Sequence, residues 1–593
     1  GSITSNGATT IGDAGTPISL AAATTINTSG GSSTANRALN LGGVISGATK
    51  ALTLTTGSGV LTTVGIGSAE NGLGAIIISA DEFNPTANIY GQSTLTIKPG
   101  TSGNTVLIGG ASNNNSDTVL DITATELGYF VNGFTGITFG SGTTGEITLS
   151  TGQTFLDPIT FTTNGADTKL GANLTGSDDA SLTFTTPVKL TIANQVITTN
   201  NRAINFSSTV NGTTTGIENL TLYPGSADIN FVNAIGNIVP IGALLVDGTG
   251  IYTFSGPMNA ASITVNSGGT TVINTTSLTT TSTQTYHNPV RLSSNTTLAT
   301  TNSDISFGGT LNGSAAGKTL TITAGTGAVT FTGAVGGSAA LGATAITAAT
   351  TTNSSTWVGN AATLGITGNA VINGAISGVT TLSVSGTTSV AANVTTSGNQ
   401  TYTGAVTVNG SAVTLNSYSG NGAVLFSSTV NSATANYYGL TVSNGTGTTA
   451  FGGAVGGTDA LGYLCINAVS CTASMAGTAT GNGTTTLAGD VTTSGTQTYG
   501  GHLTLGANTA LTSTANSGNG AVTIAGNVNS SSTVFNGILQ FLGNGYWEIS
   551  TNSGSTWAYY TSTSSASTYQ VSGANAGVSF TSTASALAST PTI

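Results

Sequence analysis

The chain has 593 residues, and only 5% of them are Asp, Glu, Lys or Arg, whereas a soluble domain usually carries about a quarter. Eight cations and 19 acids give a net charge of −11, and no Lys or Arg follows Lys318. Because phosphate binding relies on clustered cations, this composition excludes a nucleic-acid partner. The longest apolar stretch, Leu73 to Ala80, is far shorter than the roughly 20 residues of a membrane helix, so no membrane span is expected.

The residue types favour strands along the whole chain. Thr, Val and Ile suit a pleated surface because their β-carbons are branched, while Asn and the 86 Gly accept the positive φ of tight corners. Helix formers are scarce, and no long stretch has apolar residues at a helical period. The sequence therefore predicts a folded, all-β protein of one repetitive architecture.

Residues 1–84 are predicted to form the first repeat unit. The marker Leu73-Gly74 begins a series in which Leu or Ile precedes Gly, and this series continues at Ile241-Gly242, Leu341-Gly342 and Leu461-Gly462. The adjacent acids Asp81 and Glu82 lie near the end of the unit and are interpreted as a solvated turn.

Residues 85–190 are the most degenerate part of the predicted solenoid. Two oxygen-rich stretches lie here, Asn113 to Asp121 and Asp178-Asp179, and carboxylate and amide oxygens are the ligands that calcium prefers. The glycine-rich, Asp-bearing nonapeptides of calcium-binding β-rolls are absent from the sequence. No metal site is therefore predicted, and Asp178-Asp179 is interpreted as a second solvated turn.

Residues 191–544 are predicted to be tandem repeats of about 100 to 120 residues. Laying Phe206 on Phe426 superposes the apolar positions without a gap as far as Val246 on Ile466. The tripeptide Gln-Thr-Tyr marks the same repeat, beginning at Gln284, Gln400 and Gln497. Each copy is followed by an apolar i, i+2 pair: Val290 and Leu292, Val406 and Val408, Leu503 and Leu505. Such pairs predict strands with one buried face.

The apolar pairs return at intervals of roughly 15 to 20 residues, which we interpret as the length of one coil. Strands this short share a core only when coils stack at about 4.8 Å. The sequence therefore predicts a parallel β-helix, or β-solenoid, rod of about 30 to 40 coils. The alternative is a string of tandem β-sandwich domains, for which three Trp and 17 Phe supply few core anchors.

Two cysteines, Cys465 and Cys471, lie in the last repeats. A Cys-x5-Cys pair closes a small disulfide loop at a corner, or the two are small buried apolar side chains, and the sequence leaves both readings open.

Residues 545–593 break the texture of the chain. Five of the seven aromatic residues in this serine-rich segment lie close together in sequence: Tyr546, Trp547, Trp557, Tyr559 and Tyr560. Exposed aromatics beside hydroxyls suit carbohydrate stacking or a protein interface, whereas buried ones would anchor the last coil. The segment is predicted to be a C-terminal cap or connector, with a binding tip as the alternative.

No catalytic residues are predicted. Sugar-cleaving β-helix enzymes need clustered acids beside cations, and the chain has adjacent acids only at the two places named above. His287 and His502 are solitary, so zinc and other cofactors are not expected. The chain is predicted not to be an enzyme, and a polysaccharide-active β-helix enzyme is the remote alternative.

Three phrases resemble the β-strand repeats of filamentous-haemagglutinin-like bacterial surface exoproteins: Gln400 to Val408, Gly452 to Gly462, and Gly518 to Ile524. The resemblance extends over about four-fifths of the chain, in a repeat style that many large adhesins share. It implies a right-handed β-helix, secretion to the extracellular cell surface and a role in attachment or biofilm formation. The Asn-Pro-Asn motifs of the family's secretion domain are absent, since Asn84-Pro85 and Asn288-Pro289 are isolated.

The expected function is that of a structural extracellular fibre or adhesin stalk on a bacterial surface. Its partners would be a host or abiotic surface, or glycans. The alternative is a self-assembling filament subunit, joined end to end with copies of itself by strand addition.

Overall fold

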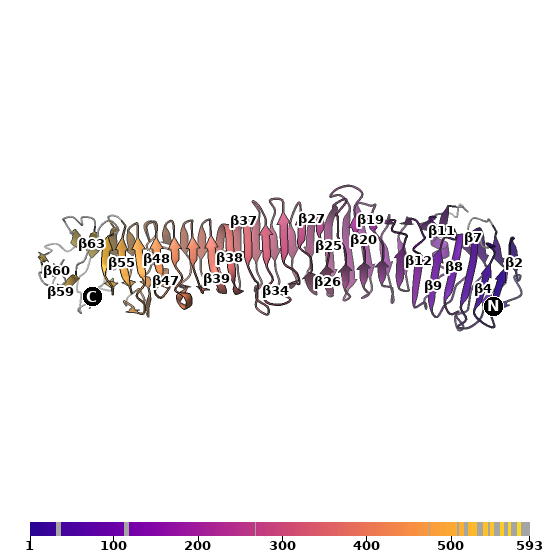
Figure 1. The fold of residues 1–593 in the computed structure, drawn as a ribbon, viewed down its shortest axis with the longest axis horizontal. Coiled ribbons are helices and arrows are strands. Elements are labelled where there is room, and N and C mark those ends of the chain that lie inside the picture. The colour runs from indigo at the N-terminus through magenta and orange to yellow at the C-terminus, as the bar shows by residue number, and fades with distance from the viewer. Residues whose placement is uncertain are drawn as a thin grey trace. The chain divides into compact units, whose positions relative to one another are not determined.

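The computed structural model describes residues 1–30, 37–111, 118–266, 268–473, 475–506, 509–514 and 520–530, together with five strands beyond residue 530. Strands hold 52% of the residues and helices 1%, and the parallel strands stack as a β-solenoid of about 23 turns (Figure 1). The predicted all-β solenoid is confirmed, and parallel pairing from coil to coil is incompatible with the sandwich alternative. The chain divides into two compact units, residues 1–296 and 297–593.

The first unit begins with short strands, followed by the long strands β7 (Leu52–Thr63) and β8 (Ile76–Pro85), and these pair in parallel from one coil to the next. The short strands and the neighbouring elements are β1 (Ser2–Thr4), β2 (Thr9–Ile11), β3 (Ile18–Ser19), β4 (Thr24–Asn27), β5 (Leu39–Leu41), β6 (Ile45–Ser46), β11 (Val119–Thr123) and the short helix α1 (Ala124–Leu127).

From β9 onward, the coils of the first unit pass through three ladders of parallel strands. Ladder 1 contains β9 (Thr94–Lys98), β12 (Gly136–Gly140), β15 (Ile159–Thr162), β18 (Leu182–Phe184), β21 (Ile204–Phe206), β24 (Ile229–Phe231), β26 (Ile251–Phe254), β28 (Thr270–Ile273) and β31 (Val290–Leu292). Ladder 2 contains β10 (Thr105–Gly110), β13 (Ile147–Leu149), β16 (Thr168–Leu170), β19 (Val188–Leu190) and β22 (Val210–Asn211). Ladder 3 contains β14 (Gln153–Phe155), β17 (Leu174–Gly176), β20 (Asn194–Thr199), β23 (Asn219–Gly225), β25 (Ile241–Gly248), β27 (Met258–Val265) and β30 (Gln284–Tyr286), and β29 (Ser277–Thr280) also pairs with β27.

A column of stacked phenylalanines runs through ladder 1. Parallel, in-register pairing places the same inward position of each strand above the last, so identical rings meet face to face. The consecutive ring centroids from Phe161 through Phe184, Phe206 and Phe231 to Phe254 are 5.2, 5.1, 4.9 and 5.3 Å apart. The core of this part of the unit therefore contains a continuous aromatic stack along ladder 1.

The second unit also has three ladders, and its long strands bend through more than one of them. Ladder 4 contains β33 (Ile305–Phe307), β36 (Ala328–Phe331), β40 (Thr388–Val390), β43 (Val406–Val408), β46 (Val430–Ser432), β53 (Val491–Thr493) and β56 (Thr509–Ser513). Ladder 5 contains β34 (Leu311–Gly313), β41 (Val394–Thr396), β44 (Ala412–Asn416), β47 (Gly439–Ser443), β49 (Leu464–Ile466), β54 (Gln497–Tyr499) and β57 (Val522–Ile524). Ladder 6 contains β35 (Leu320–Thr323), β42 (Gln400–Tyr402), β45 (Val424–Phe426), β48 (Thr448–Phe451), β52 (Thr484–Leu487), β55 (His502–Leu505) and β58 (Val528–Ser530). The bent strands β37 (Thr344–Asn353), β38 (Trp357–Ile372) and β39 (Ile376–Val384) connect these ladders, the short helix η1 (Tyr418–Gly420) follows β44, and β32 (Thr296–Thr300) lies at the division between the units.

The predicted coil length is wrong, because it is too short. Ile305 pairs in register with Val329, and the intervening pair Leu320 and Ile322 belongs to a different ladder. Each i, i+2 pair therefore marks one face of a coil, and three pairs complete it. One coil, from Ile305 to Val329, takes 24 residues, and the shorter assumed interval of 15 to 20 residues explains why about 30 to 40 coils were expected where the structure has about 23.

In the second unit the length of the sequence repeat is not a whole number of coils. Alignment of the repeat copies lays Phe331 on Phe451. Phe331 lies in ladder 4, which continues through Val408, whereas Phe451 lies in ladder 6 above Tyr402 and Phe426. Each copy therefore begins one face away from the copy before it.

The Gln-Thr-Tyr tripeptides form buried side-chain pairs. In each, Gln and Tyr point into the core, as an i, i+2 pair must, while the Thr between them lies on the opposite face of the strand. The hydroxyl of Tyr402 donates to Oε1 of Gln400 at 3.0 Å, and Nε2 of Gln400 donates to the carbonyl of Asn416 at 3.0 Å. Gln284 with Tyr286 and Gln497 with Tyr499 repeat the pair at 3.1 and 3.0 Å. Burial raises the pKa of all three tyrosines far above the ordinary value of a phenol.

A carboxylate or amide directly before a strand fastens one coil to the next. Oδ1 of Asp228, Asp304 and Asn399 accepts from the backbone N–H of Ile251, Ala328 and Ala423 at 2.8, 2.8 and 2.9 Å. These corners thus use one acceptor oxygen, supplied by either Asp or Asn.

Candidate functional site

Three projections that share an asparagine-fastened backbone plan leave the corners of the coils, and a shorter loop pair, residues 46–50 and 67–74, shares their bond at the Leu/Ile-Gly marker, from the N–H of Gly74 to the carbonyl of Lys50 at 3.0 Å. Each projection consists of two loops from successive coils that hydrogen-bond to each other. Projection 1 comprises residues 211–218 and 236–243, projection 2 comprises residues 312–318 and 336–343, and projection 3 comprises residues 431–438 and 456–463. Projections 2 and 3 both belong to the second unit, where they follow strands of different ladders, β34 and β46.

An asparagine begins each projection and fastens its two loops together. Oδ1 of Asn211 accepts from the backbone N–H of Ile238 at 3.0 Å. Asn312 and Asn431 bind the N–H groups of Ser338 and Thr458 in the same way, at 3.0 and 3.1 Å. The shared framework therefore depends on an amide oxygen at one fixed position.

Two glycines in each projection explain markers seen in the sequence. Gly242, Gly342 and Gly462, from the Leu/Ile-Gly series, donate their N–H to the carbonyls of Glu218, Lys318 and Tyr438 at 2.7, 2.8 and 2.8 Å. Gly236, Gly336 and Gly456 adopt φ of 65°, 73° and 66°, which favours glycine. A Cβ there would lie 2.0 to 2.1 Å from a carbonyl oxygen of the next coil.

The side chains at the tips of the projections differ sharply. Projection 1 exposes Ile217 and Ile238, which are 54% and 76% accessible. Projection 2 has Lys318 among small residues, and projection 3 exposes Tyr437 at 65% beside Tyr438. A constant framework with variable exposed tips is typical of loops that recognise partners.

Glu218 organises the first loop of projection 1 from inside. Its carboxylate accepts from the backbone N–H of Thr213 and Thr214 at 3.1 and 3.0 Å and from the hydroxyl of Thr213. Burial alone would raise the pKa of Glu218, but these hydrogen bonds hold it below the ordinary value. The carboxylate is therefore ionised at neutral pH and serves as a structural acceptor.

The structure joins Cys465 and Cys471 by a disulfide, with their Cα atoms 6.0 Å apart. Of the two readings left open by the sequence, it adopts the corner disulfide. The bond fastens an excursion that contains the antiparallel pair β50 (Ala468–Val469) and β51 (Thr478–Ala479). The hydroxyl of Thr496 on the next coil donates to the carbonyl of Thr472 at 2.6 Å, so the excursion is also tied to the core.

Four of the five predicted C-terminal aromatics lie in described strands. Tyr546 and Trp547 are in β60 (Tyr546–Ser550), and Tyr559 and Tyr560 are in β61 (Ala558–Thr561). These strands pair antiparallel, with Trp547 opposite Tyr560, and β59 (Ile538–Gly543) pairs with β60. Trp557 lies outside the described residues, and the role of this segment as a cap or a binding tip stays a prediction. Two further strands, β62 (Ser567–Gln570) and β63 (Val578–Ser582), pair antiparallel with each other, and β63 pairs with β56.

The prediction of a solvated turn at Asp81 and Glu82 is wrong. Both residues lie inside β8 and are buried, because the strand bends where its register with β7 shifts. Oδ1 of Asp81 accepts from the backbone N–H of Thr101 at 2.8 Å, and burial raises the pKa of Asp81. The carboxylate therefore holds a corner of the coil from within.

Asp178 and Asp179 lie exposed in a turn, as predicted. Oδ2 of Asp178 accepts from Nδ2 of Asn132 at 2.9 Å. Asp157, on the preceding coil, is buried and accepts from the N–H of Gly133 at 2.8 Å. Burial, with repulsion from Asp179 and Asp178, raises the pKa of Asp157. In the described part of the chain, no three His, Cys, Asp or Glu side chains gather closely enough to hold a metal ion.

The two histidines are not brought together. His287 is exposed at the end of β30, and Nδ1 of His502 accepts from the backbone N–H of Asn527 at 3.1 Å. His502 thus has a local structural partner on the next coil.

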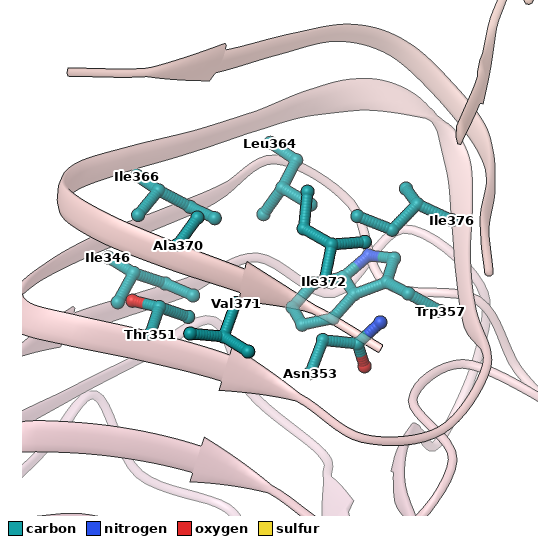
Figure 2. A pocket seen from close by; sticks show the side chains of 10 residues that line it. All are labelled: Ile346, Thr351, Asn353, Trp357, Leu364, Ile366, Ala370, Val371, Ile372 and Ile376. Atoms are coloured by element: carbon teal, nitrogen blue, oxygen red, sulfur yellow. The ribbon is translucent and has the colours of Figure 1, made fainter. Parts of the chain in front are cut away.

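A small cavity lies inside the second unit where β37, β38 and β39 bend. Figure 2 shows Asn353, Ile372 and Ile376 around the indole of Trp357, with Thr351 farther from the indole and beside Ile346. Its volume of about 10 Å³ matches about one water molecule. This cavity is therefore far too small to admit a sugar or a cofactor.

Comparison with family models, curated proteins and solved structures gives no match. None of the helices in the described residues has the length and apolarity needed to cross a bilayer.

Proposed function

We propose that the chain is the structural shaft of an extracellular adhesin or fibre on a bacterial surface. The observation that supports this proposal is the set of three projections, which carry different side chains on one repeated framework. A scaffold that repeats its loops and varies their tips suits the display of contact sites.

The composition of the wall supports the same role. Thr, Ser and Asn cover the outer faces, and no Lys or Arg follows Lys318, so the surface is hydrated without being strongly charged. Such a surface limits non-specific electrostatic binding and leaves contact to particular loops.

The test measures attachment by the full chain. Beads that carry it are passed over host-cell layers, immobilised polysaccharide and bare polystyrene, and compared with beads that carry the heat-denatured chain. We expect the folded chain to hold beads on at least one surface more strongly than the denatured control does. Equal retention on all three would contradict the proposal, and release of reducing ends from the polysaccharide would favour an enzyme instead.

A further inference from the structure

Projection 3 bears a group of three tyrosines, Tyr437, Tyr438 and Tyr463, which we name the tyrosine cluster. Tyr437 is 65% exposed, and the other two side chains are partly exposed. The rings of Tyr437 and Tyr438 meet edge to face, with centroids 4.9 Å apart. An aromatic surface thus faces solvent at the corner of the coil.

The third ring occupies a place prepared for it by a glycine. In the register of β47 with β49, Tyr463 lies opposite Gly439 of the preceding coil. A Cβ on Gly439 would lie 2.0 Å from the ring of Tyr463. Projections 1 and 2 have Ala243 and Ala343 at the position of Tyr463, opposite Asn219 and Thr319. The large ring and the glycine beneath it are therefore a paired change, found in projection 3 alone among the three copies.

The backbone beneath the cluster is fixed by hydrogen bonds from three coils. Asn436, at φ of 67°, donates its N–H to the carbonyl of Ala460 at 2.8 Å. The N–H of Tyr438 donates to the hydroxyl of Ser432 at 3.2 Å, and the hydroxyl of Ser494 donates to the carbonyl of Asn436 at 3.1 Å. A ligand would meet a surface that is already ordered, which lowers the entropic cost of binding.

The two loops of projection 3 contain no cation. Asp459 is the one charged residue in the sequence of projection 3, and Thr434 and Thr458 of the same two loops are exposed. Aromatic faces suit the apolar C–H face of a pyranose ring, and hydroxyls and backbone groups supply partners for its hydroxyls. With no cation in the projection, a carboxylated or sulfated sugar would find no counter-charge.

We propose that the tyrosine cluster binds neutral oligosaccharides by stacking pyranose rings on the exposed faces of Tyr437 and Tyr463. The inference deepens the proposed role in attachment and rests on it, since it names the ligand class of one projection. Tyr438 supports Tyr437 from the side, and Asp459 disfavours anionic sugars at the same place.

Calorimetric titration of the full chain tests the proposal with three probes: hexamers of β-1,4-linked glucose, of β-1,4-linked N-acetylglucosamine and of β-1,4-linked glucuronic acid. We expect at least one neutral hexamer to bind and the glucuronic acid hexamer not to bind. Tyr437→Ala and Tyr463→Ala should each weaken binding about tenfold, the loss expected from one aromatic contact.

Matched variants separate stacking from damage to the fold. Tyr463→Ala installs the residue that Ala243 and Ala343 supply in the other projections, so the coil should persist, which circular dichroism checks. Tyr437→Phe should keep binding within about threefold, because the ring rather than the hydroxyl makes the contact. Tyr418→Ala, which removes a tyrosine of 51% exposure at another corner, should leave binding unchanged.

Failure of both neutral hexamers to bind would overturn the inference, as would binding that the Tyr437 and Tyr463 variants do not weaken. Bead attachment distinguishes this failure from failure of the proposed function. Attachment that persists without any sugar binding removes the tyrosine cluster as a site and leaves the adhesive role standing, whereas loss of both removes both proposals.

Discussion

The two units build the same kind of coil with very different use of charge. Residues 1–296 hold seven of the eight cations and fifteen of the nineteen acids, while residues 297–593 hold one and four. Yet both units fasten successive coils at the same place, the residue before a strand, through Asp228 in the first and Asp304 or Asn399 in the second. The coil therefore needs an acceptor oxygen at this corner and tolerates either its charged or its neutral form.

The cores of the two units differ as well. The first unit contains the five-ring column from Phe161 to Phe254, whereas the second has shorter stacks such as Tyr402, Phe426 and Phe451. Of the three Gln-Tyr pairs, Gln284 with Tyr286 belongs to the first unit, and Gln400 with Tyr402 and Gln497 with Tyr499 belong to the core of the second unit. Its stability should therefore depend more on satisfied hydrogen bonds than that of the phenylalanine column does.

The largest effect is expected from Phe206→Ala, in the middle of the column. The change removes a buried ring that stacks on Phe184 and Phe231, and it should lower the local free energy of unfolding by about 3 to 5 kcal/mol. Hydrogen exchange of peptides from ladder 1 measures this loss. Thr253→Ala, on the outer face of β26, is the control and should change it by less than about 0.5 kcal/mol. Equal effects of the two changes would contradict the importance of the column.

Gln400→Leu should cost less, about 1 to 3 kcal/mol. It leaves the hydroxyl of Tyr402 and the carbonyl of Asn416 without the partner that Gln400 provides. Adding Tyr402→Phe should recover part of the loss, because the orphaned hydroxyl is then gone. A double-mutant cycle followed by hydrogen exchange checks this, and strictly additive losses would show that the pair is not coupled.

Substitutions of Asp228 test whether a neutral amide can replace the carboxylate at the corner of the coil. Asp228→Ala removes the acceptor for the N–H of Ile251 and should cost about 1 kcal/mol, whereas Asp228→Asn should change stability by less than about 0.5 kcal/mol. Asn399→Ala in the second unit should match Asp228→Ala. If Asp228→Asn cost as much as Asp228→Ala, the charge itself would be required.

The smallest effect should depend on pH and arises at Asp157. Because burial raises its pKa in the folded state, ionised Asp157 destabilises the first unit at neutral pH, and this penalty fades as pH falls through the folded pKa. Asp157→Asn keeps an acceptor for the N–H of Gly133, so it should be more stable than the parent at pH 7. The two should become equally stable below the ordinary carboxyl pKa of about 4. Urea unfolding at both pH values measures the difference, and a less stable Asp157→Asn at pH 7 would refute this account.

Much of the fold could be predicted because inward positions alternate with outward ones. The pairs Val290 with Leu292 and Val406 with Val408 are buried as expected, and their spacing indicated strands. That spacing could not show that three faces make one coil, because the coil depends on which strands pair, as β33 does with β36. The buried acids Asp81 and Glu82 were missed for a related reason, since a register shift turns them inward.

The Leu/Ile-Gly markers of the projections are visible in the sequence, but from the sequence they indicated only the repeat length. The Leu/Ile-Gly markers at Gly242, Gly342 and Gly462 are the points where the second loop of each projection bonds to the first. Pairing between loops on different coils cannot be inferred from one loop alone, so the exposure of Tyr437 and Ile238 was not predicted. The tyrosines could have been found as a departure from the other copies, which have Ala at the position of Tyr463.

The mismatch between repeat and coil has a consequence for how a partner is met. In the second unit each repeat copy starts on a different one of the three faces of the coil from the copy before it. Its loops therefore leave the solenoid on another side of its axis. Because successive copies are offset by one face, their tips point to more than one side of the solenoid. The molecule can therefore contact a surface in more than one orientation. Had the repeat equalled a whole number of coils, every tip would stand in one row, and contact would require the molecule to turn that row toward its target.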